Sequence, residues 1–234
     1  MPLTGRVALV TGGTGALGQA VTLRLLADGA SVWVPYIVEE ERHRLLASVP
    51  PADAARLHVT GADVTDPQRV AALVAEVRQA HAGRLDVLVT LVGGFAGGTL
   101  VETDHVTWAR MLDLNLTSAF TVTRAVVPAM IAAGHGRIVT IGSRAVLPPT
   151  GGFIAYTVAK AGVIAFTRAL AQELKDTGVT ANCVLPSTMD TPANRAAMPG
   201  ADRRGWVPVE GVADAIAFLA RDAAGHVTGA LLTI

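Results

Sequence analysis

Close to its N-terminus the chain reads Arg6-Val7-Ala8-Leu9-Val10-Thr11-Gly12-Gly13-Thr14-Gly15-Ala16-Leu17-Gly18. The first five residues form a short apolar run of the kind that becomes a buried strand. Glycines follow at once, and beyond them Leu17, Val21 and Leu25 recur at the spacing of one helix face. The stretch therefore predicts a strand, a tight turn and a helix.

The same alternation of strand and helix continues to the end of the chain. Further strands are expected at 31–36, 57–60, 87–92, 137–141, 179–184 and 230–233, and helices at 39–48, 67–81, within 106–133, at 155–175 and at 209–221. Strands that alternate with helices imply right-handed crossovers and parallel pairing. We therefore predict an α/β fold, a doubly wound parallel sheet of about seven strands with helices on both faces, Rossmann-like, in a single domain over residues 1–234.

Residues 187–208 break this regularity. They are rich in Pro, Arg and Met and show no helical or strand period. Because long irregular loops in compact domains are usually functional, we expect this segment to be a mobile loop over a substrate site.

Composition excludes several classes of protein. The 234 residues are 51% hydrophobic but only 4% aromatic, which suits an aliphatic core between parallel strands and helices. Nineteen basic residues balance nineteen acidic ones without a basic cluster, so nucleic-acid binding is not expected. The sequence begins without a secretory signal, and no apolar stretch is expected to span a membrane, so we predict a cytoplasmic protein with no membrane partner.

Cysteine and histidine add no metal or disulfide chemistry to this expectation. The single cysteine, Cys183, lies in an apolar run and is expected to be a small buried side chain. The six histidines are scattered without the spacing of metal ligands, so no metal site is predicted.

The glycine cluster contains the pattern Gly-x-Gly-x-x-Gly, read from Gly13, where a strand ends and a helix opens. Such a turn presents bare backbone N–H groups to a pyrophosphate at the positive end of a helix dipole. A plain structural turn is the alternative, but the setting favours a bound dinucleotide. The expected contacts are Gly12, Thr14, Gly15, Ala16, Leu17 and Gly18.

The second strand ends at Tyr36, where NAD sites commonly carry an acidic residue that binds the ribose hydroxyls. The missing acid favours NADP(H), with NAD(H) possible, because positions 36 and 37 carry no arginine and Glu39, Glu40 and Glu41 follow. After the third strand, Asp63 and Val64 are expected to flank the adenine ring, although Asp63 could equally be a helix-start residue.

Tyr156 and Lys160 are four residues apart, which places both on one face of a helix. A lysine charge is expected to lower the pKa of a neighbouring phenol, so that the tyrosine can exchange a proton with a carbonyl oxygen. The chain has two tyrosines and two lysines, and the pair has a chance expectation of about 0.02. The alternative is an ordinary pair on a solvated helix face.

With these motifs the sequence resembles the short-chain dehydrogenase/reductase family nearly from end to end. In that family an Asn, a Ser, the Tyr and the Lys form the active site. Ser143, thirteen residues before Tyr156, matches the serine that binds the substrate oxygen, although a serine there can also be a strand-end cap. Asn115 matches the asparagine that kinks a helix and anchors a water-mediated proton relay to the lysine.

The resemblance also implies contacts to the nicotinamide half of the cofactor. Lys160 and Tyr156 would face the nicotinamide ribose, and Gly93 would lie at the end of the fourth strand. The stretch Pro186 to Thr191 matches the family's Pro-Gly-x-x-x-Thr with Ser187 in place of glycine, so Pro186, Thr188, Met189 and Thr191 are expected contacts. Two departures are Ala16 at a usual glycine position, and Thr90-Leu91-Val92-Gly93 in place of Asn-Asn-Ala-Gly.

The sequence thus predicts an oxidoreductase that moves a hydride between a nicotinamide cofactor and a ketone or secondary alcohol, a 3-oxoacyl thioester being one candidate. The alternatives are a dehydratase or isomerase on the same fold, and a non-catalytic dinucleotide sensor. The substrate is a small molecule, and Phe95, Val146, Leu147, Phe153, Met189 and Met198 are expected to make its cleft apolar. The family resemblance implies a homo-oligomer, a tetramer or a dimer.

Overall fold

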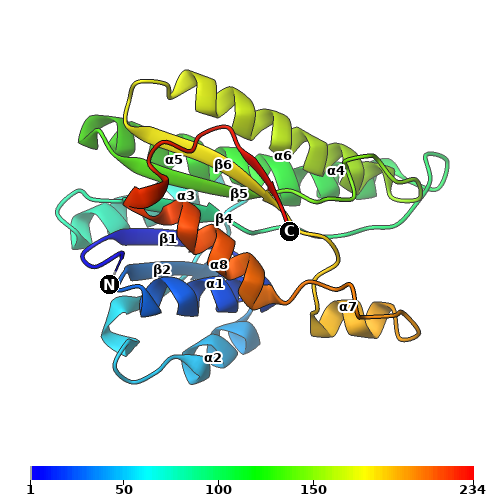
Figure 1. Ribbon diagram of the computed structural model, residues 1–234, viewed down its shortest axis with the longest axis horizontal. Coiled ribbons are helices and arrows are strands. Elements are labelled where there is room, and N and C mark those ends of the chain that lie inside the picture. The colour runs from blue at the N-terminus through cyan, green and yellow to red at the C-terminus, as the bar shows by residue number, and fades with distance from the viewer. Residues whose placement is uncertain (1) are drawn as a thin grey trace.

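All seven strands join one parallel sheet in the order β3-β2-β1-β4-β5-β6-β7 (Figure 1). The computed structural model describes residues 2–234. The strands are β1 Val7–Thr11, β2 Ser31–Tyr36, β3 Leu57–Gly61, β4 Val87–Thr90, β5 Gly136–Ile141, β6 Val179–Leu185 and β7 Leu231–Thr233. The predicted fold class is confirmed, and the predicted strand limits differ from these by at most two residues.

Helices connect successive strands. They are α1 Ala16–Ala27, α2 Glu39–Ser48, α3 Pro67–Ala80, α4 His105–Leu112, α5 Ser118–Ala133, α6 Ile154–Glu173, α7 Pro192–Ala197 and α8 Val209–Ala220, with a π-helical turn η2 Asp113–Thr117 and short 3₁₀ turns η1 Ala54–Arg56 and η3 Asp222–Ala224. The loop predicted at 187–208 therefore contains one short helix, α7, which Figure 1 shows set apart from the sheet.

β1 is buried on both faces of the sheet, and four of its five residues are apolar. Ala8 and Val10 pack on one face with α1 and α8, which lie side by side in Figure 1. Val7 and Leu9 point to the other face and join the cluster formed by α3, α5 and α6. This arrangement explains the nearly continuous apolar strands, since alternation of polar residues is lost when both faces are covered.

Two helices are long and apolar enough to cross a membrane, contrary to the expectation from the sequence. They are the continuous helix His105–Ala133 and α6. Length and composition alone are weak evidence for a membrane span, because a helix that covers a sheet passes the same test. Both helices have buried residues in the core: Val122 and Val126 from the first, and Leu170 from α6.

One aromatic cluster sits across β2 and β3. Trp33 is paired with His58 in the sheet register, and their rings stack with centroids 4.5 Å apart. The indole N–H of Trp33 donates to Nε2 of His81 at 2.9 Å. Burial lowers the pKa of His58, and the nearby His81 adds to the effect while Glu76 opposes it.

We predict that acid destabilises the protein through this cluster. The pKa of His58 in the folded chain lies below the ordinary value of 6.5, so the unfolded chain binds the proton more strongly and the free energy of unfolding falls as the pH drops below 6.5. Between pH 7.5 and pH 5 the free energy of unfolding, measured with urea, should fall less for His58→Phe, which keeps a stacking ring, than for the wild type. The exposed His226, changed to Gln, provides the control. An equal fall in His58→Phe and in the wild type would contradict the prediction.

Candidate active site

Two glycines let the first turn approach the rest of the sheet closely. Gly12 has a left-handed backbone, φ +71°, and a Cβ there would lie 2.8 Å from the backbone nitrogen of Val92. A Cβ on Gly18 would overlap the carbonyl oxygen of Gly12. The turn between β1 and α1 is therefore pressed against the segment that follows β4, and any side chain at either glycine would force the backbones apart.

The first turn of α1 is open to a ligand. Its N-cap, Gly15, has no side chain to cap the helix, whereas Asp66 caps α3 and Asp104 caps α4. Within residues 2–234 no side chain accepts from the N–H groups of Ala16 to Gly18. Unpaired N–H groups at the positive end of a helix suit a pyrophosphate, so the predicted cofactor residues of this turn fit the phosphates of a dinucleotide.

At the adenosine end of the expected site, two of the glutamates that follow Tyr36 bind hydroxyl groups, which the sequence did not predict. The Thr14 hydroxyl donates to Glu41 Oε2 at 2.8 Å, and the Tyr36 hydroxyl donates to Glu39 Oε1 at 2.8 Å. This second bond raises the pKa of Tyr36 and lowers that of Glu39. Arg42 lies over the Tyr36 ring, 5.4 Å from its centroid. An arginine of α2 thus lies next to Tyr36.

Asp63 and Val64, which the sequence predicts to flank the adenine ring, both have partners within the protein. Asp63 Oδ1 accepts from the backbone N–H and the hydroxyl of Thr65, at 2.9 and 2.7 Å. Val64 is buried in the core. The alternative for Asp63, a helix-start cap, is wrong because Asp66 accepts from the first N–H groups of α3. Asp63 instead forms a turn, as aspartate side chains commonly do.

Asn115 lies in the π-helical turn that separates α4 from α5. Its amide nitrogen donates to the carbonyls of Met111 at 3.0 Å and Gly94 at 3.1 Å, and its Oδ1 accepts from the Gly94 N–H at 3.3 Å. The predicted interruption of the helix is confirmed in its position. Because π turns free backbone groups inside a helix, the side chain of Asn115 can bond both its own helix and the loop after β4.

Lys160 is buried and donates to the backbone carbonyl of Ile141 at 3.0 Å. Burial lowers its pKa from 10.5 to about 8, and the neighbouring Cys183 has a smaller opposite effect. Cys183 is itself a buried free thiol, as the sequence predicted. The ammonium is thus held inside the protein at the carboxyl end of β5.

The side chains of Asn115 and Lys160 both approach the backbone of Gly93. A Cβ on this glycine would lie 2.6 Å from Asn115 Oδ1 and 3.4 Å from Lys160 Nζ. Both polar groups therefore meet at the bare backbone after β4, at the same edge of the sheet as the glycine turn. Sequence spacing could not reveal this contact, since the three residues come from three different elements.

Tyr156 and Ser143 complete the cluster. Ser143 follows β5, is nearly buried, and its Oγ accepts from the Ala145 N–H at 3.2 Å. Burial raises the pKa of Tyr156, while its hydrogen bond with Ser143 acts in the opposite direction. The prediction of a lowered phenol pKa was wrong, because burial raises it, and Lys160 Nζ lies 5.9 Å from the ring centroid. Tyr156 is consequently protonated at neutral pH.

The segment after β6 is ordered by its own hydrogen bonds. The Pro186 carbonyl accepts from Arg144, and the Thr188 carbonyl accepts from Val207 at 2.9 Å. The carbonyl of Met189 and the hydroxyl of Thr191 both accept from Asn194, the latter as the N-cap of α7. These four predicted contacts therefore lie on one loop beside Ser143, although the Thr191 hydroxyl already serves the helix.

Aromatic rings form one wall next to Tyr156. Phe95 is 66% exposed, and its ring centroid lies 5.1 Å from that of Tyr156 and 5.7 Å from that of Phe153. A cavity of about 320 Å³ at the start of α6 is lined by Thr99, Leu100, Pro149, Thr150, Gly151, Gly152, Ile154 and Thr157. The segments after β4 and before α6 thus meet next to Tyr156, but none of the six side chains predicted to make the substrate cleft apolar lines this cavity.

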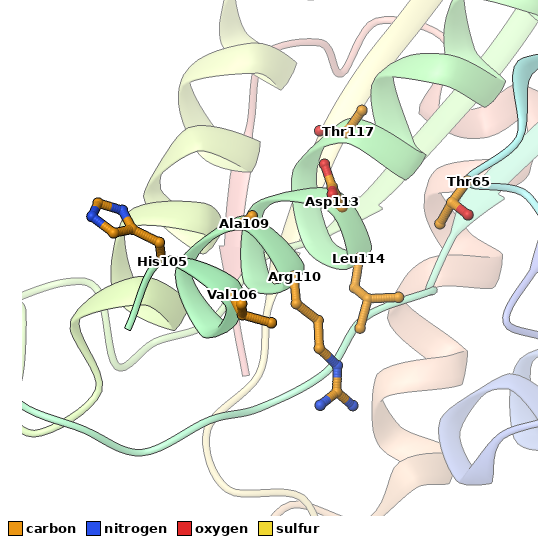
Figure 2. Close-up of a pocket in the computed structure, with 8 residues that line it drawn as sticks. All are labelled: Thr65, His105, Val106, Ala109, Arg110, Asp113, Leu114 and Thr117. Atoms are coloured by element: carbon orange, nitrogen blue, oxygen red, sulfur yellow. The ribbon is translucent and has the colours of Figure 1, made fainter. Parts of the chain in front are cut away.

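A larger hollow, about 730 Å³, lies elsewhere, along the outer side of α4. Figure 2 shows its wall as one helix face, from His105 to Thr117, with Thr65 opposite from the segment before α3. It does not contain the four residues of the predicted catalytic cluster. Residues 2–234 contain no group of three His, Cys, Asp or Glu side chains that could hold a metal ion.

Comparisons with known proteins agree with this geometry. The family model described as short chain dehydrogenase matches residues 6–201. The chain is 33% identical to 3-oxoacyl-[acyl-carrier-protein] reductase FabG of Escherichia coli K12, over 100% of this chain and 97% of that one. It is 34% identical to acetoacetyl-CoA reductase of Allochromatium vinosum, over 98% and 96%.

Among solved structures, NAD⁺-bound xylitol dehydrogenase superposes with a TM-score of 0.91 at 26% identity, over 100% of this chain and 99% of that one. The chain belongs to the short-chain dehydrogenase family. It is a nicotinamide-dependent oxidoreductase with a single Rossmann-like domain.

We predict that Lys160→Met stabilises the protein while abolishing turnover. The fall of the Lys160 pKa from 10.5 to about 8 corresponds to about 3 kcal/mol, and losing the bond to Ile141 offsets about 1 kcal/mol. The free energy of unfolding at pH 7 should therefore rise by about 2 kcal/mol. The wild type should recover the difference as the pH rises from 8 to 10.5, because the unfolded chain alone then still binds the proton.

Chemical denaturation at pH 7 and pH 10 measures the gain in the free energy of unfolding at pH 7 and its disappearance at high pH. Lys175→Met removes the chain's other lysine, which is exposed, and is the matched control. A loss of stability in Lys160→Met at pH 7 would show that the buried ammonium stabilises the fold instead.

Proposed function

We propose that the protein reduces the ketone of a 3-oxoacyl thioester with a nicotinamide cofactor, Tyr156 being the proton donor. The observation that carries the proposal is the meeting of Tyr156, Ser143, Lys160 and Asn115 at the sheet edge where the glycine turn opens. The names of the relatives, 3-oxoacyl-[acyl-carrier-protein] reductase and acetoacetyl-CoA reductase, support the thioester. The exposed ring of Phe95 supports an apolar acyl chain beside the tyrosine.

In this proposal the substrate carbonyl oxygen accepts hydrogen bonds from Tyr156 and Ser143. When bound, the nicotinamide supplies the hydride that adds to the carbonyl carbon. Tyr156 gives its proton to the oxygen, so the ketone becomes a secondary alcohol and the tyrosine a phenolate. Lys160 balances that negative charge, and Asn115 holds the loop after β4 in place and takes part in returning a proton.

Burial keeps Tyr156 in the protonated form that a reduction requires. Because the pKa of Tyr156 is raised, the phenol carries its proton across the neutral range and is ready to act as an acid. Alcohol oxidation would need the phenolate first, and would therefore be promoted by alkaline pH.

Each part of the proposed dinucleotide has residues that suit it. The phosphates would lie on Gly12, Gly15 and the open N–H groups of α1, and Lys160 and the loop Pro186–Thr191 would face the nicotinamide half. NADP(H) is the proposed preference, with NAD(H) possible, because Tyr36 is not acidic and Arg42 stacks on it. A cytoplasmic location goes with this proposal.

We predict that Tyr156→Phe lowers kcat for acetoacetyl-CoA reduction by about 10²–10⁴-fold, because a general acid is removed, while the Kd of the cofactor changes little. Absorbance of NADPH or NADH at its nicotinamide band measures turnover, and calorimetry measures the Kd. A wild type that binds cofactor but consumes none with any ketone, or a variant with full turnover, would contradict the assignment. The first result would favour a dehydratase, an isomerase or a dinucleotide sensor.

We infer that the protein is a homo-oligomer, a dimer or tetramer, that pairs through the outer faces of α4, α5 and α6. Only 33% of the most apolar window of the helix His105–Ala133 is buried, and 39% of that of α6. Phe120 on α5 is 48% exposed and contacts Phe166 on α6, with ring centroids 6.2 Å apart. The hollow along α4 in Figure 2 continues this surface.

Phe120→Asp is therefore expected to lower the molecular mass in solution, because a carboxylate cannot be buried unpaired in an apolar contact. Light scattering coupled to size exclusion measures the mass. The matched control is Leu46→Asp, which charges an exposed leucine on α2. A wild type of about 24 kDa would refute the oligomer itself.

A further inference from the structure

The carboxyl ends of β1 and β2 lie side by side, and a hydroxyl follows or ends each strand. These are Thr14, in the glycine turn, and Tyr36, the last residue of β2. In dinucleotide folds the adenosine ribose lies between these two places. Both hydroxyls already donate to carboxylates from the first turn of α2: Thr14 to Glu41 and Tyr36 to Glu39, each at 2.8 Å.

The bond to Glu41 is the more sheltered of the two. Thr14 is 5% exposed, and the Glu41 side chain is 34% exposed against 59% for Glu39. The second oxygen of Glu41 lies 3.9 Å from an Arg44 nitrogen, a weak contact with an exposed arginine. The Glu41 charge therefore stays largely uncompensated beside the glycine turn.

Arg42 opposes the carboxylate charge next to Tyr36. It donates to Glu39 at 3.2 Å and stacks on the ring, but its buried Nε has no hydrogen-bond partner within residues 2–234. The six residues 39–44 hold three glutamates and two arginines, with His43 between them. The local charge is thus negative when His43 is neutral.

We propose that Glu41 is a specificity-determining residue that disfavours a 2′-phosphate on the adenosine ribose. A ribose hydroxyl can donate to its carboxylate, whereas a phosphate monoester carries between one and two negative charges at pH 7 and is repelled. Glu41 thereby limits the preference for NADP(H) that Tyr36 and Arg42 create. The inference rests on dinucleotide binding at the glycine turn, as proposed above.

Glu41→Gln tests the charge with little change of shape, since the glutamine carbonyl can still accept from Thr14. Calorimetry with NADP⁺, NAD⁺, adenosine 2′,5′-bisphosphate and adenosine 5′-monophosphate measures affinity without turnover. The Kd values of the two 2′-phosphorylated ligands should fall about tenfold at low salt, and less at high salt. The Kd values of the other two ligands should change less than about twofold.

Glu40→Gln is the matched control, because Glu40 lies in the same turn, is exposed, and its side chain has no hydrogen bond or ion pair within residues 2–234. It should leave the ratio of the NADP⁺ and NAD⁺ affinities nearly unchanged. Arg42→Gln should move that ratio the opposite way from Glu41→Gln.

Three results would overturn the inference. An equal gain in Glu40→Gln would mean that the field of the helix acts and not Glu41. An unchanged ratio in Glu41→Gln, in a wild type that binds a dinucleotide, would refute the role of Glu41 and leave the proposed function intact. A wild type that binds neither dinucleotide would refute both.

Discussion

The contact between the backbones of Gly18 and Gly12 is the constraint from which the arrangement of the site follows. It draws the first turn of α1 onto the end of β1, and Gly12 in turn meets the backbone after β4. Three backbones can converge only where no Cβ intervenes. The convergence places the open end of the helix at the sheet edge next to Gly93, and with it the region where Lys160 and Asn115 meet.

A second constraint, the burial of Lys160, works against stability. Its ammonium is held by the Ile141 carbonyl inside the protein, at the cost of a lowered pKa. The charge is costly because the apolar strands and helices around it exclude the water that would solvate it. A functional site that keeps a strained or poorly solvated group in this way is common, since activity and stability make different demands on the same residue.

Much of the architecture could be predicted from the sequence because its signals are local. Apolar runs such as Val7 to Val10 mark strands buried on both faces, and the glycine turn and the Tyr156/Lys160 spacing each belong to one element. The contacts between elements could not be predicted. The stack of Trp33 on His58 depends on strand register, the bond of Thr14 to Glu41 on how α2 leaves β2, and the raised pKa of Tyr156 on burial.

The glutamates of α2 show how a local preference can acquire a role at a distance. Acidic residues in a first helical turn are favoured by the helix dipole, by about 0.3–1 kcal/mol each, and α2 carries three of them with no side-chain cap. That reason alone would account for Glu39, Glu40 and Glu41. Yet the short connection from β2 brings two of them onto hydroxyls at the expected ribose site, while Glu40 remains free in the same field. Helix stability and cofactor choice are therefore coupled at Glu41, so a change that relieves repulsion of a phosphate also removes a favourable charge from the start of α2.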